Sequence, residues 1–350
     1  MLFIVLSQFI ITKLNYFCEK INSLSVKKRK KSYTLSKYLF FRIFAPSLVS
    51  STSNRHTTFM NKRLYSIFIL ALSLLAMVGC NFSEEYHEGE DSSQSQFEVV
   101  EFTPAPGQFI NEGYTATSAI EACEYAQSRL DDQLYISLGG FGGYIVVKSK
   151  TPITNSGGYD FGIYSNIFDG SSEPGIVWVS CDTNANGVAD DEWFELYGSE
   201  SEKESTRYNY KITYSRTDDA TEIAWHDNHG ESGTISRNSA HPQDYFPAWI
   251  SANEYTLSGT CLPHNSEWDE ISKKWILRSF EWGYVDNLST IDFASDRANR
   301  FRISDARTAS GEVADLKQIY FIKVQSAINH INSAICETST EVSGFVSYCE

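Results

Sequence analysis

The chain has 350 residues, 44 of them acidic and 29 basic, which gives a formal net charge of −15 at pH 7. Residues 1–79 contain twelve Lys or Arg and a single acid, so residues 80–350 carry a net charge of −26. The negative electrostatic field of these residues repels phosphate groups, which argues against nucleic acid as a partner. Neutral ligands and divalent cations fit the composition better.

The segment 1–79 differs in composition from the rest of the chain and is interpreted as targeting sequence. A basic start at 60–63, an apolar run at 64–78 and a small residue before Cys80 are typical of a secretory signal. Residues 60–79 resemble a bacterial lipoprotein signal peptide, in which Cys80 becomes the lipidated first residue. The apolar run is shorter than the roughly 20 residues that span a membrane.

Two further segments flank this signal. We interpret residues 1–59 as a non-native extension from an overcalled start codon; the alternative is a genuine cytoplasmic extension with a basic patch. Residues 80–105 are polar and acidic, which predicts a flexible tether. An acidic stretch behind a lipidated cysteine is similar to the surface-export signal of Bacteroidetes lipoproteins. We therefore expect a lipid-anchored outer-membrane protein that is exposed at the cell surface.

Residues 106–350 are expected to form one folded domain. Apolar residues recur every three or four positions from 117 to 130, which predicts a helix with Ile120, Cys123, Ala126 and Leu130 on its apolar stripe. Beyond it, short β-branched and aromatic runs alternate with turn residues and predict strands at 134–138, 144–148, 162–167, 176–179, 193–197, 208–214, 249–250, 255–259, 275–284, 301–303 and 319–324. This pattern predicts an all-β, jelly-roll-like β-sandwich with one short N-terminal helix and long loops.

A calcium loop is predicted between two of these strands. Oxygen donors follow the alternate spacing of such a loop at Asp182, Asn184, Asn186, Val188 (through its carbonyl group) and Asp190. Trp193 stands where an EF-hand has its bidentate Glu, so the loop is not an EF-hand. The alternative is a metal-free hairpin turn at Asn186-Gly187.

Cysteine spacing argues against another class of metal site. The domain has five cysteines beyond Cys80 and no Cys-x-x-Cys pair, so zinc is not expected. The sequence allows one or two disulfides but does not assign their pairing, and at least one thiol would remain unpaired.

Several motifs together resemble one family. They include Glu-Pro-Gly-Ile-Val-Trp-Val-Ser at 173–180, Trp-Gly-Tyr-Val-Asp-Asn at 282–287 and Glu-Thr-Ser-Thr-Glu-Val-Ser-Gly at 337–344. This set resembles the uncharacterised cell-surface lipoproteins of gut Bacteroidetes, often accompanied by PKD-like domains and encoded beside outer-membrane nutrient transporters, including corrinoid loci. The resemblance implies a surface location and a TonB-dependent transporter as a partner. Cys336 stands where that family usually shows Gly, so a glycine-specific backbone conformation is not predicted there.

A second oxygen-rich site is predicted from residue types and strengthened by this resemblance. Asp160, Asn166 and Glu173 precede or begin expected strands and are interpreted as gathering around a hard cation, as in calcium-bearing jelly rolls. The alternative is that Asp160 and Asn166 cap turns while Glu173 faces solvent.

Aromatic residues make up 14% of the chain, and secreted binding modules use aromatic faces to stack on sugars and other flat ligands. The segment 225–230 is interpreted as a loop that presents a ligand face. The candidate ligand-binding residues are Trp225, His226, Trp249, Trp282 and Tyr284.

These observations predict a calcium-stabilised surface lipoprotein that binds a nutrient, a glycan or a corrinoid, as an accessory to outer-membrane uptake. No Gly-x-Ser-x-Gly or His-Glu-x-x-His signature is present, so catalysis is not expected. The alternatives are a carbohydrate-active hydrolase or lyase, and a structural or adhesive surface protein.

Overall fold

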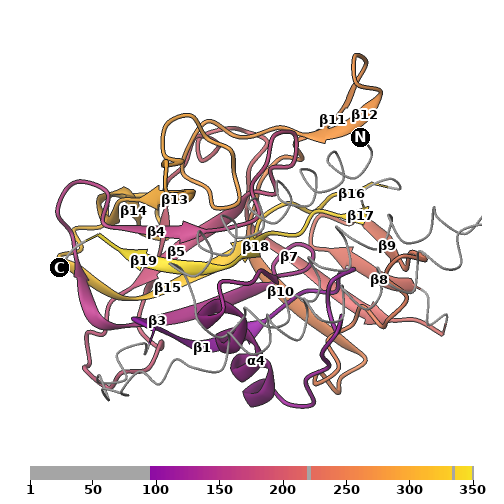
Figure 1. Ribbon diagram of the computed structural model, residues 1–350, viewed down its shortest axis with the longest axis horizontal. Coiled ribbons are helices and arrows are strands. Elements are labelled where there is room, and N and C mark those ends of the chain that lie inside the picture. The colour runs from indigo at the N-terminus through magenta and orange to yellow at the C-terminus, as the bar shows by residue number, and fades with distance from the viewer. Residues whose placement is uncertain (1–94, 219–221, 333–335, 349–350) are drawn as a thin grey trace, which may run out of the picture. The chain divides into compact units, whose positions relative to one another are not determined.

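The computed structural model describes residues 95–218, 222–332 and 336–348 (Figure 1). The expected extension at 1–59, the signal peptide at 60–79 and the lipidation site Cys80 lie outside these residues. Within them the chain is mostly β-structure in several antiparallel sheets, with one α-helix. The prediction of an all-β, sandwich-like fold is confirmed.

The largest sheet has six strands in the order β1-β3-β15-β5-β6-β14. They are β1 (Phe97–Thr103), β3 (Tyr144–Thr154), β15 (Gln318–Ser326), β5 (Gly175–Ser180), β6 (Trp193–Leu196) and β14 (Ala306–Arg307). Because side chains alternate across a strand, Val177 and Val179 of β5 face the same side as Ile322 of β15 and join the main hydrophobic core.

A three-stranded sheet contributes to the same core. It consists of β13 (Ala298–Phe301), β4 (Phe161–Tyr164) and β19 (Gly344–Ser347). The rings of Phe161 and Phe301 stack at 5.5 Å, and Phe345 of β19 contacts Phe97 of β1 at 5.6 Å. The two sheets therefore enclose one core between them.

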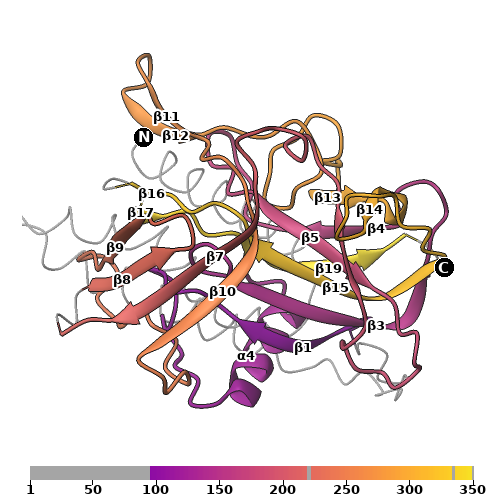
Figure 2. The ribbon, with the colours of Figure 1, turned by 180° about the vertical axis from the view of Figure 1, so that it is seen from behind.

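A four-stranded sheet, in the order β10-β7-β8-β9, lies at the other end of the described unit from β4 and β13 in both views (Figure 1, Figure 2). Its strands are β10 (Glu254–Cys261), β7 (Arg207–Arg216), β8 (Glu222–Asp227) and β9 (Ser232–Ser236). It has a separate, ring-rich core that includes Tyr210, Tyr214 and Phe246.

Short pairings complete the described β-structure. They are β11 (Ser266–Asp269) with β12 (Lys274–Leu277), β16 (Ile331–Asn332) with β17 (Cys336–Glu337), and β18 (Glu341–Val342) with β2 (Ile136–Ser137); a 3-10 helix, η1, spans Ile303–Asp305. The pairing of β18 with β2 places Glu341 opposite Ser137.

The helix α4 spans Ala119–Asp131 and packs against β1. The Ser118 hydroxyl caps it by accepting a hydrogen bond from the Glu121 backbone N–H. The predicted helix is confirmed, but its predicted stripe is wrong at Ile120, whose side chain is 72% exposed. Ala122 is buried instead, together with Ala126 and Leu130, which lie on the same face of the helix.

Some predicted boundaries are corrected. The strand β1 falls inside the segment 80–105 predicted as a flexible tether, yet its Phe97, Val99 and Phe102 are buried. The segment 225–230, interpreted as a loop, begins inside β8. Residues 249–250 form a turn instead of a strand, because the Ile250 N–H donates to the carbonyl of Pro247.

The described cysteines are free thiols: Cys123, Cys181, Cys261 and Cys336. Cys336 has a φ of 61°, so the left-handed backbone conformation is present although the residue is not glycine.

Candidate functional site

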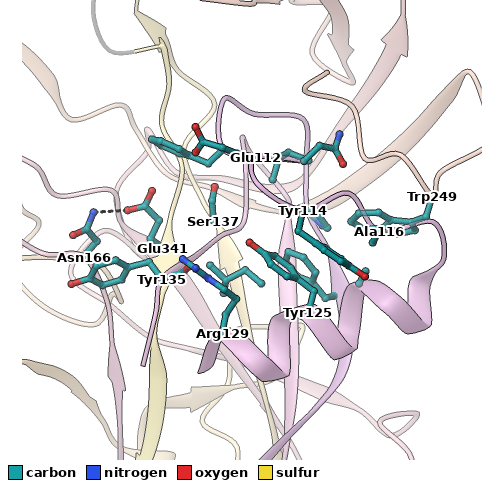
Figure 3. A pocket seen from close by; sticks show the side chains of 17 residues that line it. Glu112, Tyr114, Ala116, Tyr125, Arg129, Tyr135, Ser137, Asn166, Trp249 and Glu341 are labelled. Atoms are coloured by element: carbon teal, nitrogen blue, oxygen red, sulfur yellow. Dashed lines mark hydrogen bonds between the residues drawn. The ribbon is translucent and has the colours of Figure 1, made fainter. Parts of the chain in front are cut away.

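A pocket of about 360 Å³ opens beside α4 (Figure 3). Its walls come from the segment between β1 and α4, from α4 itself, from the region of β2, and from the turn that carries Trp249. Six of its 17 lining residues are aromatic: Phe102, Phe109, Tyr114, Tyr125, Tyr135 and Trp249. The pocket therefore offers several ring faces to a ligand.

Two pairs of rings are already in contact within this lining. Tyr114 and Tyr125 stack with their centroids 4.8 Å apart and their planes 12° apart, and Figure 3 shows them side by side above α4. Trp249 packs against Phe102 at 6.2 Å. Because these rings support one another, the walls are preorganised.

Charged groups lie among the rings. Arg129 of α4 donates from Nε and Nη2 to the Tyr135 carbonyl oxygen, at 3.0 and 2.7 Å. It forms no ion pair with any carboxylate of the described residues. Glu112 contacts the Nδ1 atom of His241 at 2.8 Å. The pocket thus contains both a cation and an acid.

An acidic cluster adjoins one end of the pocket. Asn166 and Glu341 line the pocket, and the Asn166 amide donates to Glu341 Oε2 at 2.8 Å (Figure 3, dashed line). Glu341 also forms a group with Glu173 and Asp286, in which one carboxylate oxygen from each residue lies within 4.8 Å of the others.

Backbone contacts hold this cluster together. The Ser339 N–H donates to Glu173 Oε1 at 3.0 Å, and the Glu341 N–H donates to Asp286 Oδ2 at 2.9 Å. Gly175 permits the close approach of these segments, because a Cβ atom there would lie 2.7 Å from Thr340 Cγ2. The segment that includes β18 is therefore fixed against the start of β5 and the loop at Asp286.

Burial and mutual repulsion shift the acidity of the cluster. Burial, reinforced by the charge of Glu341, raises the pKa of Glu173 to about 8. Burial, with the charges of Glu341 and Glu173, raises the pKa of Asp286 well above its ordinary value. Burial also raises the pKa of Glu341, against the Asn166 hydrogen bond, which lowers it.

The structure removes Asp160 from the predicted group of Asp160, Asn166 and Glu173. Asp160 binds elsewhere: its Oδ1 accepts from Ser156 and its Oδ2 from the Ile303 N–H. Asn166 and Glu173 do come together, but around Glu341.

Sequence reasoning missed the other two members of the cluster, Asp286 and Glu341. The sequence does contain a signal for them. Asp286 and Glu341 are acidic residues within the motifs 282–287 and 337–344, which carry the family resemblance.

The predicted calcium loop is an exposed, hydrogen-bonded turn. Asp190 accepts from the side-chain amides of Asn184 and Asn186, and Asp182 Oδ2 accepts from the Gly187 N–H at 3.0 Å. The Val188 N–H donates to Asn186 Oδ1 at 2.8 Å. A calcium ion would have to replace several of these bonds, so calcium at this loop stays a prediction.

The predicted ligand-binding residues are dispersed. Trp249 lines the pocket beside α4, whereas Trp282 lines a second pocket of about 150 Å³, and Trp225 and His226 lie on β8. Tyr284 is only 2% exposed, and its hydroxyl accepts from the Glu200 N–H. Its ring is part of the interior, so its predicted ligand contact is corrected.

No known family model matches the sequence, and a comparison with curated proteins finds no significant match. The resemblance to Bacteroidetes lipoproteins therefore stays a prediction. In the described part of the chain, no helix has both the length and the apolar composition to cross a bilayer.

Proposed function

We propose that the protein captures a small ligand with flat faces and hydrogen-bonding edges, a glycan or a corrinoid, in the pocket beside α4. The observation that carries this proposal is the ring-lined volume of about 360 Å³ bounded by Tyr114, Tyr125 and Trp249. Small-molecule sites combine mainly apolar and aromatic walls with a few polar groups, at volumes of about 300–1,000 Å³. The volume of about 360 Å³ lies at the lower end of that range.

Polar groups around the rings support the proposal. The Nη1 atom of Arg129 has no hydrogen-bond partner among the described residues, so it is available to an oxygen of a sugar, an amide or a phosphate. The Glu112 carboxylate accepts hydrogen bonds from hydroxyl groups. The aromatic rings then supply contact area for the ligand, and the charged groups of Arg129 and Glu112 orient it.

The proposal includes a cellular setting. A lipid anchor at Cys80 would hold the domain at the outer-membrane surface, where it would pass its ligand to a TonB-dependent transporter. The signal-like segment 60–79 and the acidic composition support this setting. Calcium is proposed as the stabilising cofactor.

Isothermal titration of the purified protein tests the proposal with defined probes: cyanocobalamin and neutral hexasaccharides of glucose, xylose and mannose. At least one probe binds. Both Trp249→Ala and Tyr125→Ala weaken its affinity about tenfold or more, because each removes a ring that contacts the ligand. The matched control is Trp282→Ala, which removes a ring from the second pocket and leaves the affinity unchanged.

Two outcomes would contradict ligand capture in this pocket. One is the absence of binding by every probe, which favours a structural or adhesive protein. The other is affinity lost in Trp282→Ala and kept in Trp249→Ala. Cleavage of an oligosaccharide during incubation would instead support the hydrolase or lyase alternative.

A further inference from the structure

Three carboxylates from distant parts of the chain converge beside the pocket. Glu173 precedes β5, Asp286 lies in the loop before β13, and Glu341 begins β18. One oxygen atom of each lies within 4.8 Å of the others. Oxygens bound to one calcium ion at about 2.4 Å are at most about 4.8 Å apart, so the separations within the cluster do not exceed the span of one calcium shell.

Among the described residues, no cationic side chain forms an ion pair with Glu173, Asp286 or Glu341 of the cluster. Buried carboxylates without a partner carry a large desolvation penalty, to which their mutual repulsion adds. A bound cation removes both penalties.

An unpartnered polar atom inside the cluster gives independent support. Asp286 is 1% exposed, and its Oδ1 has no hydrogen-bond partner among the described residues. Ser165 lies beside Asp286 in the same buried region. Buried polar groups in folded proteins are almost always paired, so the free acceptor capacity of Asp286 Oδ1 indicates room for a further partner.

We propose that Glu173, Asp286 and Glu341 bind one hard divalent cation, calcium in the first place. Carboxylate oxygens are the ligands that calcium prefers, and it takes 6–8 of them together with carbonyl groups and water. Asn166 is a positioning residue, since its amide holds Glu341 Oε2 at 2.8 Å. This site is independent of ligand capture in the neighbouring pocket.

The ion would join the start of β5, the loop at Asp286 and β18. Glu341 and Asn166 also line the pocket, so the ion would fix the shape of that end. Stability and pocket geometry would then both depend on the cation.

Titration of chelator-treated protein with calcium chloride tests the site, with magnesium and manganese chloride as parallel probes. Wild type binds one calcium ion in this site, and its melting temperature rises with calcium concentration because the ion binds only the folded state. Asp286→Asn and Glu341→Gln each weaken calcium affinity about tenfold or more, because each removes a charged ligand. Metal-free Asp286→Asn melts no lower than metal-free wild type, because the substitution removes repulsion.

The matched control is Asp182→Asn in the exposed loop, which keeps the wild-type affinity. The proposal is overturned if none of the three ions binds, or if Asp286→Asn and Glu341→Gln both keep the wild-type affinity. Binding lost only in Asp182→Asn assigns the ion to the loop and also overturns it. If one variant fails to fold, the other variant and the calcium content of dialysed wild type still decide the question.

Discussion

At the scale of single residues, Cys336 has an unusual backbone conformation next to the acidic segment. Its φ is 61°, and the following residue, Glu337, accepts from the Gln108 N–H through Oε1 at 2.5 Å. A Cβ atom in the left-handed region crowds the following carbonyl group and costs about 1–2 kcal/mol. The strained residue, Cys336, therefore lies directly before the segment that carries Glu341.

This strain leads to a prediction about two substitutions of Cys336. Cys336→Gly and Cys336→Ala both remove the Sγ contact with Asn238, at 3.2 Å, but only the glycine variant relieves the strain. After allowance for the entropy of glycine in the unfolded chain, the glycine variant is more stable by about 1 kcal/mol. Urea denaturation measures the difference, and equal stabilities would show that the site is not strained.

At the scale of elements, α4 supplies one wall of the pocket, and its position depends on its first turn. The Ser118 hydroxyl accepts from the Glu121 N–H at 3.2 Å, while the Glu121 carboxylate accepts from the Thr117 N–H and hydroxyl, both at 2.8 Å. The first contact satisfies an amide group that the helix start leaves free, and the second ties the residue before the cap to the first turn. The side chains of Tyr125 and Arg129 then project from a fixed helix.

Ser118→Ala is expected to lower the free energy of unfolding by about 1 kcal/mol, because one amide group of α4 loses its acceptor. Ser118→Asp keeps an acceptor and retains most of the stability. The midpoints of urea denaturation compare the three proteins. A fall in Ser118→Asp as large as that in Ser118→Ala would refute the capping role.

The elements also differ in how well local sequence predicts them. Residues 176–179 are predicted as a strand because they are rich in β-branched residues, and the structure places them in β5. The strand β8 is missed, because Glu222, His226 and Asp227 interrupt its apolar pattern at the more exposed sheet. Strand pairing there depends on neighbours that local sequence does not specify.

At the scale of the whole molecule, buried acids make stability depend on pH. Burial raises the pKa of Glu195 to about 7, against the Thr260 hydrogen bond and the charge of Lys323, which lower it. Thr260 Oγ1 donates to Glu195 Oε2 at 2.6 Å. The folded state therefore holds a proton on Glu195 at pH values where the unfolded chain has released it.

The stabilising contribution of Glu195 is complete below its ordinary pKa of 4.5 and is lost as the pH rises through about 7. We expect chelator-treated protein to lose stability between these values, by on the order of 2 kcal/mol from this group. Glu195→Gln removes the titration and flattens this part of the profile. Urea denaturation at several pH values measures the free energy of unfolding of wild type and of Glu195→Gln. Parallel pH profiles for the two proteins would contradict the assignment of this pH dependence to Glu195.

Sequence alone determined the β-rich class and the single described α-helix, because these follow from local patterns. Only the tertiary structure decided that Asp286 and Glu341 join Asn166 and Glu173 and that Asp160 does not. Those contacts connect β18 and the residues directly before it to segments 55 and 166 residues away. Convergence over such separations depends on how the sheets pair and pack, and no local pattern encodes that pairing.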